Sequence, residues 1–221
     1  MSNCPSCGAP LPERSVLPYV TCAYCHTLIL RNGLSLEEVG KVAVLPPDVS
    51  PIQLGTSFRI GDALLTVIGR VRWGWADGSW NEWLLSGGDG SEHWLGEAMG
   101  AFMLTRARPD LLEHPAIAPF AAGNGDIPVG TRIEVEDVTL TAVDCKDAQC
   151  LGSEGDLPFA TLPGRVMASI DFRGPDSEAV SIQRDERGPS AWLGHYSELA
   201  ALAPGNLRKM EGWTIPAGLE R

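Results

Sequence analysis

The sequence lacks three patterns that would each point to a class of protein: a long apolar run, the basic-then-apolar pattern of a signal peptide, and an excess of basic residues. No stretch of the 221 residues approaches the roughly 20 apolar residues of a membrane-spanning helix, so direct membrane insertion is not expected. No basic segment followed by an apolar one begins the chain, which predicts a cytoplasmic protein. The 17 basic residues against 28 acidic ones give a net charge of −11. That charge counts against nucleic-acid binding by the chain as a whole.

The motifs of catalysis and nucleotide binding are also missing. The chain contains no GxSxG elbow, no GxxxxGK phosphate loop and no GxGxxG opening a helix after a strand. The GGDG run at 87–90 indicates a turn, because no helix start follows it to supply backbone amides. We therefore predict no catalytic residue and keep an enzyme only as an alternative.

Glycine and proline, by contrast, are abundant, at 25 and 17 residues, and the 44% of hydrophobic residues is typical of a folded chain. A high density of turns favours many short strands over long helices. We predict a mainly β chain with an N-terminal zinc ribbon, a linker and two related small antiparallel β-barrel or half-sandwich units, with the bounds 1–33, 34–51, 52–126 and 127–221.

The linker combines a helical signal with an extended one. Ser35 and Glu38 form a capping-box pattern, which predicts a short helical turn over 35–41. The prolines at 46, 47 and 51 then predict a stiff, extended connection. Elsewhere we expect helix only near 109–112 and 197–202.

The two β units are predicted from a weak internal repeat. Ile52-Gln-Leu-Gly-Thr56 resembles Ile127-Pro-Val-Gly-Thr131, and an Asp and a Leu-Thr pair follow each segment at the same spacing. The offset is 75 residues throughout, so the match needs no gap. Each copy continues as strands, and the Asp77-Gly78 pair between two tryptophans indicates a hairpin.

Four cysteines in two CxxC pairs are the most specific signal in the chain. Tight CxxC turns present two thiolates each, and Zn²⁺ prefers a tetrahedral shell of four such sulfurs. A closed shell leaves no position for water, so we predict a structural Zn²⁺ ion rather than a catalytic one. Two disulfides or four idle thiols are the alternatives. The predicted ligands are Cys4, Cys7, Cys22 and Cys25.

The other two cysteines, Cys145 and Cys150, have a CxxxxC spacing that is loose for a shared metal turn. Two reduced thiols near a strand end are the simplest interpretation. A redox pair or part of a second metal site remains open.

A tryptophan-rich hairpin is the second distinctive feature. Its rings either close the barrel core through cross-strand pairing or form an exposed surface that docks a partner, with arginines beside them. The candidate interaction residues are Arg70, Arg72, Trp73, Trp75, Trp80 and Trp83. Glu82 lies among them as a possible buried carboxylate, but spacing supplies no second catalytic group.

The order of these motifs resembles the bacterial DUF4178 family, a domain of unknown function. The resemblance is carried by the ribbon, then Leu54-Gly-Thr, Val67-Ile-Gly-Arg, Trp80-Asn-Glu-Trp and Asp89-Gly with Trp94-Leu. Later segments that resemble it are Gly155-Asp-Leu-Pro, Asp171-Phe-Arg-Gly and Trp192-Leu-Gly-His-Tyr. The resemblance covers about residues 52–213 and implies an accessory or assembly role, linked to membrane stress, without catalytic residues.

We therefore expect a non-enzymatic zinc-binding adaptor that acts through protein–protein contacts in a bacterial complex. A nucleic-acid-binding accessory protein that uses the ribbon, Arg70 and Arg72 is one alternative. An enzyme with a pocket between the two β units is the other, with Glu82, Glu154 or Asp156 as its first candidates. The oligomeric state is left open.

Overall fold

The computed structural model describes residues 2–12, 16–45, 49–162, 164–215 and 219. Over these residues thirteen strands form one antiparallel sheet, and the helices are single turns, namely η1 (Pro109–Glu113), α1 (Ala118–Ala121) and η2 (Leu199–Leu202). None of these turns has the length or apolar character that crossing a bilayer requires. The prediction of a mainly β chain is confirmed.

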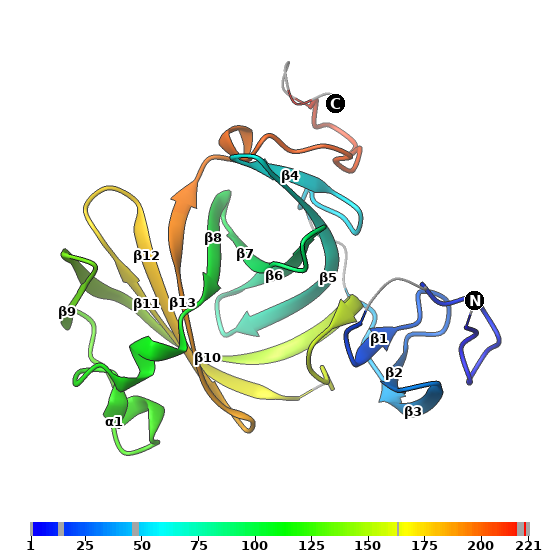
Figure 1. Ribbon diagram of the computed structural model, residues 1–221, viewed down its shortest axis with the longest axis horizontal. Helices are drawn as coiled ribbons and strands as arrows, with labels where there is room; N and C mark the ends of the chain where they lie inside the picture. Colours follow the sequence, from blue (N-terminus) through cyan, green and yellow to red (C-terminus); the bar gives the residue numbers. More distant parts are fainter. Residues whose placement is uncertain (1, 13–15, 46–48, 163, 216–218, 220–221) are drawn as a thin grey trace.

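Eight of the strands close into a barrel (Figure 1). They are β5 (Ala63–Trp75), β6 (Gly78–Gly87), β7 (Glu92–Ala98), β8 (Ala101–Ala107), β10 (Val138–Leu157), β11 (Val166–Arg173), β12 (Glu178–Asp185) and β13 (Gly188–Ser197). Hydrogen-bonded neighbours follow one another around the ring as β5-β6-β7-β8-β13-β12-β11-β10, and β10 pairs with β5. A ring of paired strands leaves few exposed sheet edges.

The tryptophan-rich segment is the β5–β6 hairpin, as its turn signal predicted. Trp75 pairs with Gly78, so Ala76 and Asp77 form the two-residue connection. β5 is rich in Val, Ile and Trp, which suit a pleated surface that is buried on both faces.

Two short strands fold back on the longest ones in the same way. β4 (Ser57–Ile60) pairs with β5, and β9 (Arg132–Val135) pairs with β10. Ser57 opposes Thr66 as Arg132 opposes Thr141, which is a constant offset of 75 residues. Each long strand also has a bulge at the same offset, after Val67 and after Ala142.

The expectation of two separate barrels or half-sandwiches is not confirmed. The two predicted units contribute four strands each to one barrel, which they close together at the β5–β10 and β8–β13 junctions. A four-stranded sheet would leave two unpaired edges, and pairing the halves satisfies both.

Two hydrophobic clusters cover the outside of the barrel. Under β4 and η2, a cluster that includes Phe58 and Leu65 packs on the outer face of β5–β8. Under β9, η1 and α1, a cluster that includes Ile133 and Leu140 packs on β10–β13. Because apolar side chains cover these outer faces, the alternate positions of the same strands point into the barrel.

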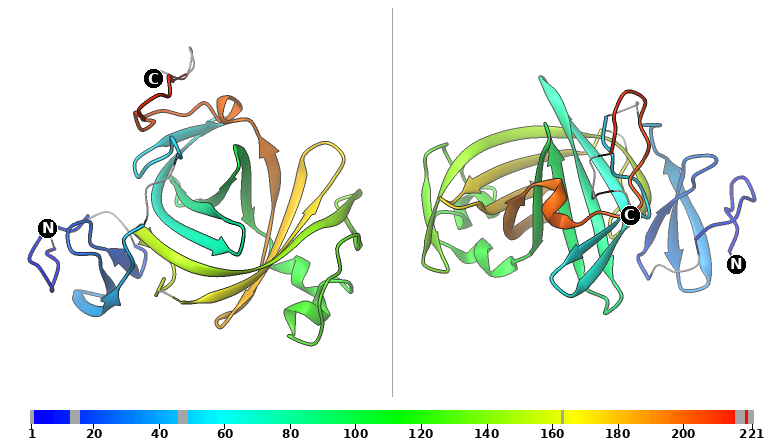
Figure 2. Two further views of the ribbon diagram at one scale, coloured as in Figure 1. Left: turned by 180° about the vertical axis from the view of Figure 1, so that it is seen from behind. Right: turned by 90° about the horizontal axis from the view of Figure 1, so that it is seen from above.

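An N-terminal module of residues 2–12 and 16–41 is attached to the side of the barrel (Figures 1 and 2). It contains β1 (Tyr19–Thr21), β2 (Thr27–Asn32) and β3 (Ser35–Lys41). β1 pairs with the end of β10, so the module extends the barrel sheet. This edge pairing fixes the module beside the β5–β10 junction.

The helical turn predicted over 35–41 is wrong, because these residues form β3. Asn32 pairs with Ser35 across a tight turn in which Gly33 has a φ of 60°. The turn directs the chain back along β2, and the pairing outweighs the local capping-box signal. Pro46 and Pro47 of the predicted linker lie outside the described residues. The helical segments predicted at 109–112 and 197–202 correspond to η1 and η2, although Ser197 itself ends β13.

Candidate functional site

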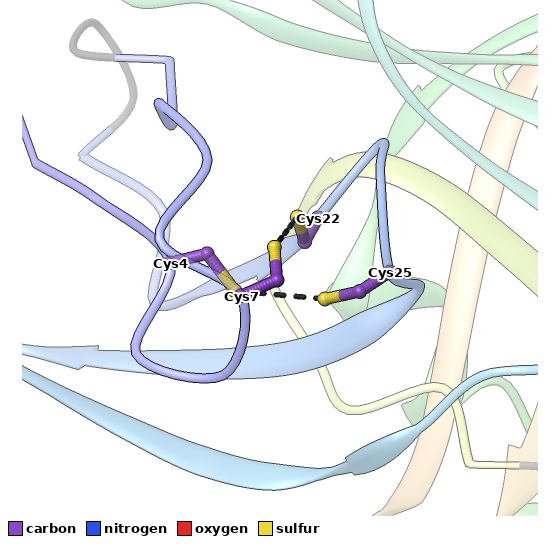
Figure 3. A group of neighbouring side chains, drawn as sticks. All are labelled: Cys4, Cys7, Cys22 and Cys25. Carbon is purple, nitrogen blue, oxygen red and sulfur yellow. Dashed lines mark hydrogen bonds between the residues drawn. The ribbon is translucent and has the colours of Figure 1, made fainter.

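The four cysteines of the N-terminal module converge from two loops (Figure 3). Their sulfur atoms all lie within 4.8 Å of one another. The Sγ atoms of Cys4 and Cys25 are 3.6 Å apart, and those of Cys7 and Cys22 are 3.8 Å apart. A tetrahedral ion about 2.3 Å from each sulfur would separate the sulfurs by about 3.8 Å. The group therefore has the dimensions to hold a metal ion.

Each loop closes in the same way. The backbone N–H of Gly8 donates to the Cys4 carbonyl, and that of His26 donates to the Cys22 carbonyl. Gly8 and His26 both have a positive φ, so the residue after each CxxC takes the left-handed conformation. His26 thus closes a loop, and it lies outside the group of four sulfurs.

The thiols have unequal acidities. Hydrogen bonds with the side chain and backbone of Thr27 lower the pKa of Cys25 to about 6. The Ala9 N–H acts to lower the pKa of Cys7, but the Cys25 thiol and other nearby groups raise it to about 12. Thiols that share protons in this way release them when a cation takes their place.

The module is also tied to the barrel by side chains. Arg31 on β2 donates to the Asp156 carboxylate on β10, with an N–O distance of 2.8 Å. Both side chains are largely buried, at 14% and 9% exposure. The four-cysteine group and the barrel are thus linked through β1, β2 and one ion pair that is largely shielded from solvent.

The barrel interior contains a cavity of about 660 Å³. This volume lies within the roughly 300–1,000 Å³ of small-molecule sites. Aromatic rings form much of its wall. Trp94 stacks on Phe159 at 5.8 Å between ring centroids and meets the edge of Trp192 at 6.1 Å, and Trp75 lies 5.6 Å from Trp80.

Glu82 on β6 places a carboxylate in this cavity. Its Oε1 accepts hydrogen bonds from Trp80 Nε1 at 3.1 Å and Gln183 Nε2 at 2.8 Å, and its Oε2 accepts one from Trp73 Nε1 at 2.9 Å. Burial raises the pKa of Glu82 above its usual value, although these three donors oppose the shift. A carboxylate offers about four acceptor positions, so one remains on Oε2.

A second carboxylate, Asp171 on β11, lines the same cavity. Burial raises its pKa, the Ser181 hydroxyl opposes that shift, and the charge of Asp144 adds to it. Its Oδ1 is buried and has no hydrogen-bond partner among the described residues. The charge of Asp171 in turn raises the pKa of Glu82, so the two groups interact inside the barrel.

The predicted interaction residues divide between the two faces of the hairpin. Trp73, Trp75 and Trp80 line the cavity. On the outer face, Arg70 donates to Asn81 and lies 4.6 Å from the Trp83 ring centroid. Trp73 and Trp83 are each 1% exposed, so these two rings lie in the core rather than on a surface.

The remaining candidates lie outside the cavity. Glu154 pairs with Arg70 at 3.5 Å, and Asp156 pairs with Arg31. Cys145 is exposed, whereas Cys150 is buried in the interior cluster. Both lie on β10 five residues apart, roughly 16 Å in an extended strand, so the structure does not bring their sulfurs together.

Sequence reasoning singled out Glu82 but not the group that accompanies it. Gln183, Trp192 and Tyr196 come from β12 and β13, and they line the same cavity as Glu82 and Asp171 only after the barrel closes. One local signal existed: Asp171 lies between Ile170 and Phe172, which pack on the outer cluster. An acidic residue at the alternate position of such a strand must face the barrel interior.

The fold and site define a closed antiparallel barrel with an acidic, aromatic-walled cavity and a four-cysteine module on its side. Residues 53–199, more than half of the chain, match the family described as domain of unknown function (DUF4178), so the protein belongs to that family. No curated protein and no solved structure matches the chain.

Proposed function

We propose that this protein binds a small organic molecule inside its barrel without transforming it. This proposal rests mainly on the Glu82 carboxylate, which three hydrogen-bond donors hold in an aromatic-walled cavity. A few positioned polar groups in a mostly apolar cavity are the usual composition of a ligand site.

Binding is better supported than catalysis, the alternative with a pocket between the two units. The cavity does bring titratable groups together, as that alternative requires. However, the described residues that line it include no histidine and no cysteine, and Glu82 is held by donors rather than paired with a nucleophile.

For the N-terminal module we propose one structural Zn²⁺ ion. Four thiolates are the shell that Zn²⁺ prefers, and a small sheet of three short strands has little apolar core of its own. Because β1 extends the barrel sheet, ordering the module also covers the end of β10.

The adaptor role is the second candidate, favoured by exposed apolar side chains on the module. Leu34 at the β2–β3 turn is fully exposed, and Tyr24 is 70% exposed. A bound protein partner should be lost from the Leu34→Ser variant but kept by a Leu64→Ser variant on the barrel, and equal retention would contradict this role. The nucleic-acid alternative has less support, since Arg70 is buried.

We also propose that the two halves of the barrel are related units. The support is the shared register of β4–β5 and β9–β10, together with the bulges at the same offset. The two units would then meet as pseudo-equivalent halves around the cavity.

Titration with a neutral, environment-sensitive naphthalene dye tests the proposed binding. We expect saturable 1:1 binding by the wild-type protein and by Val166→Phe, whose side chain is 60% exposed on β11. Ser169→Phe on the same strand should weaken binding at least about tenfold, because Ser169 lines the cavity.

Gly96→Leu provides a second filling variant if Ser169→Phe fails to fold, since a Cβ at Gly96 would have no neighbour closer than 3.6 Å. No dye binding by the wild type, or equal binding by a folded filling variant, would contradict the proposal.

A further inference from the structure

Two carboxylates that line the cavity, Glu82 and Asp171, are incompletely paired. Oδ1 of Asp171 is buried without a hydrogen-bond partner among the described residues, and Oε2 of Glu82 has accepted one hydrogen bond. Leaving a buried acceptor unpaired costs about 1–3 kcal/mol. A donor placed between the two carboxylates would remove that cost.

The nearby cations are already engaged. Lys146 pairs with Asp144, and its Nζ lies 4.9 Å from the Trp75 ring centroid. The Arg173 guanidinium lies 4.0 Å from the ring centroid of Tyr196. These two cations offset part of the negative charge near Asp171, whereas the groups that donate to the Glu82 carboxylate are neutral: Trp73, Trp80 and Gln183.

The lining of the cavity as a whole is also negatively charged. Among the described residues that line it, six are acidic and three are basic. Part of the cavity wall is aromatic, where Trp94 contacts both Phe159 and Trp192. The cavity therefore offers two carboxylates with unfilled acceptor positions, together with an aromatic wall.

Resting on the proposed binding function, we propose that the ligand is an organic amine with an apolar body. Its ammonium group lies between Glu82 and Asp171, where it donates hydrogen bonds to Oε2 and Oδ1. Its apolar body lies against Trp94 and Trp192. Ammonium groups also interact favourably with aromatic faces, which surround this part of the barrel.

A matched series that differs only in the polar group tests this assignment. Calorimetric titrations with octylammonium, 1-octanol and octanoate should show octylammonium binding at least about tenfold more tightly than octanol, and octanoate binding most weakly. Glu82→Gln and Asp171→Asn should each reduce octylammonium affinity towards that of octanol and leave octanol affinity unchanged. Glu113→Gln, at an exposed position of η1, is the control.

The outcomes separate the two proposals. If octanol or octanoate binds as tightly as octylammonium, the amine assignment is overturned and the binding function stands. If none of the three binds and the dye does not bind either, the binding function itself fails. Because Asp171 has fewer hydrogen bonds than Glu82, Asp171→Asn remains informative if Glu82→Gln does not fold.

Discussion

At the scale of single residues, the sequence was most informative at the cysteines, where both the residue type and its spacing are typical of a metal site. The CxxC pairs predicted which four sulfurs meet, because each pair lies on one tight turn and soft ligands gather around one ion. Glu82 stood out as an acid among tryptophans. Asp171 was not selected: its place between Ile170 and Phe172 indicates an inward-facing acid, but nothing near it in the chain reveals that β11 and β6 line one cavity.

The raised pKa of Asp171 predicts how the free energy of unfolding changes with pH. The pKa of Asp171 is raised in the folded protein, mainly by burial, so its contribution to stability is fully present below the ordinary pKa of 3.8. That contribution is lost as pH rises through the raised value. In urea unfolding from about pH 4 to about pH 8, the wild type should lose stability relative to Asp171→Asn.

At Asp89 the pKa is lowered rather than raised, so the change of stability with pH has the opposite sign. Hydrogen bonds from Ser91 lower the pKa of Asp89, so the wild type should gain stability relative to Asp89→Asn as pH rises towards 3.8. A wild-type to Asp171→Asn difference that does not change with pH would contradict the buried position of Asp171.

At the scale of elements, hairpins and turns were largely predictable and junctions were not. The β5–β6 hairpin followed from Asp77-Gly78, whereas residues 35–41 form a strand despite their capping-box pattern. Pairing with β2 makes this segment a strand. The local sequence pattern does not reveal how much such a tertiary contact stabilises one conformation over another. The same limit applied to the β5–β10 and β8–β13 junctions.

Both junctions have a glycine at a close approach of the backbones. A Cβ at Gly69 would overlap with the Asp156 carbonyl oxygen, and one at Gly194 would overlap with the Leu104 carbonyl oxygen. We expect Gly69→Ala and Gly194→Ala each to lower the free energy of unfolding by about 3 kcal/mol or more. Gly96→Ala on β7 should change it by less than about 1 kcal/mol. Urea unfolding measures all three, and equal stability of Gly194→Ala and Gly96→Ala would contradict the packing at the junction.

The N-terminal module makes a separate prediction about the metal. Cys22→Ser leaves three sulfur ligands, so bound zinc should fall from one ion per chain to near zero, and the backbone amides of β2 should lose hydrogen-exchange protection. The barrel strands β11 and β12 should keep theirs. Cys145→Ser removes an exposed thiol outside the group and should retain the ion. Elemental analysis that finds zinc in Cys22→Ser at the wild-type level would exclude this site.

At the scale of the whole molecule, the cavity exists because two four-stranded halves close on each other. Strands were predicted in both halves of the chain, but the proposed repeat suggested that each half would fold on itself. Whether a sheet closes alone or with a partner depends on its edges and curvature, which are set by contacts between residues far apart in the chain. The site therefore could not be assembled from the sequence, although one of its carboxylates was recognised.

A crystal structure of the protein grown with octylammonium would show both the cavity and its occupant. We predict that the nitrogen atom lies within hydrogen-bond distance of Glu82 and Asp171, with the alkyl chain against Trp94. A barrel interior filled by its own side chains, or an amine bound only on the outer surface, would contradict it.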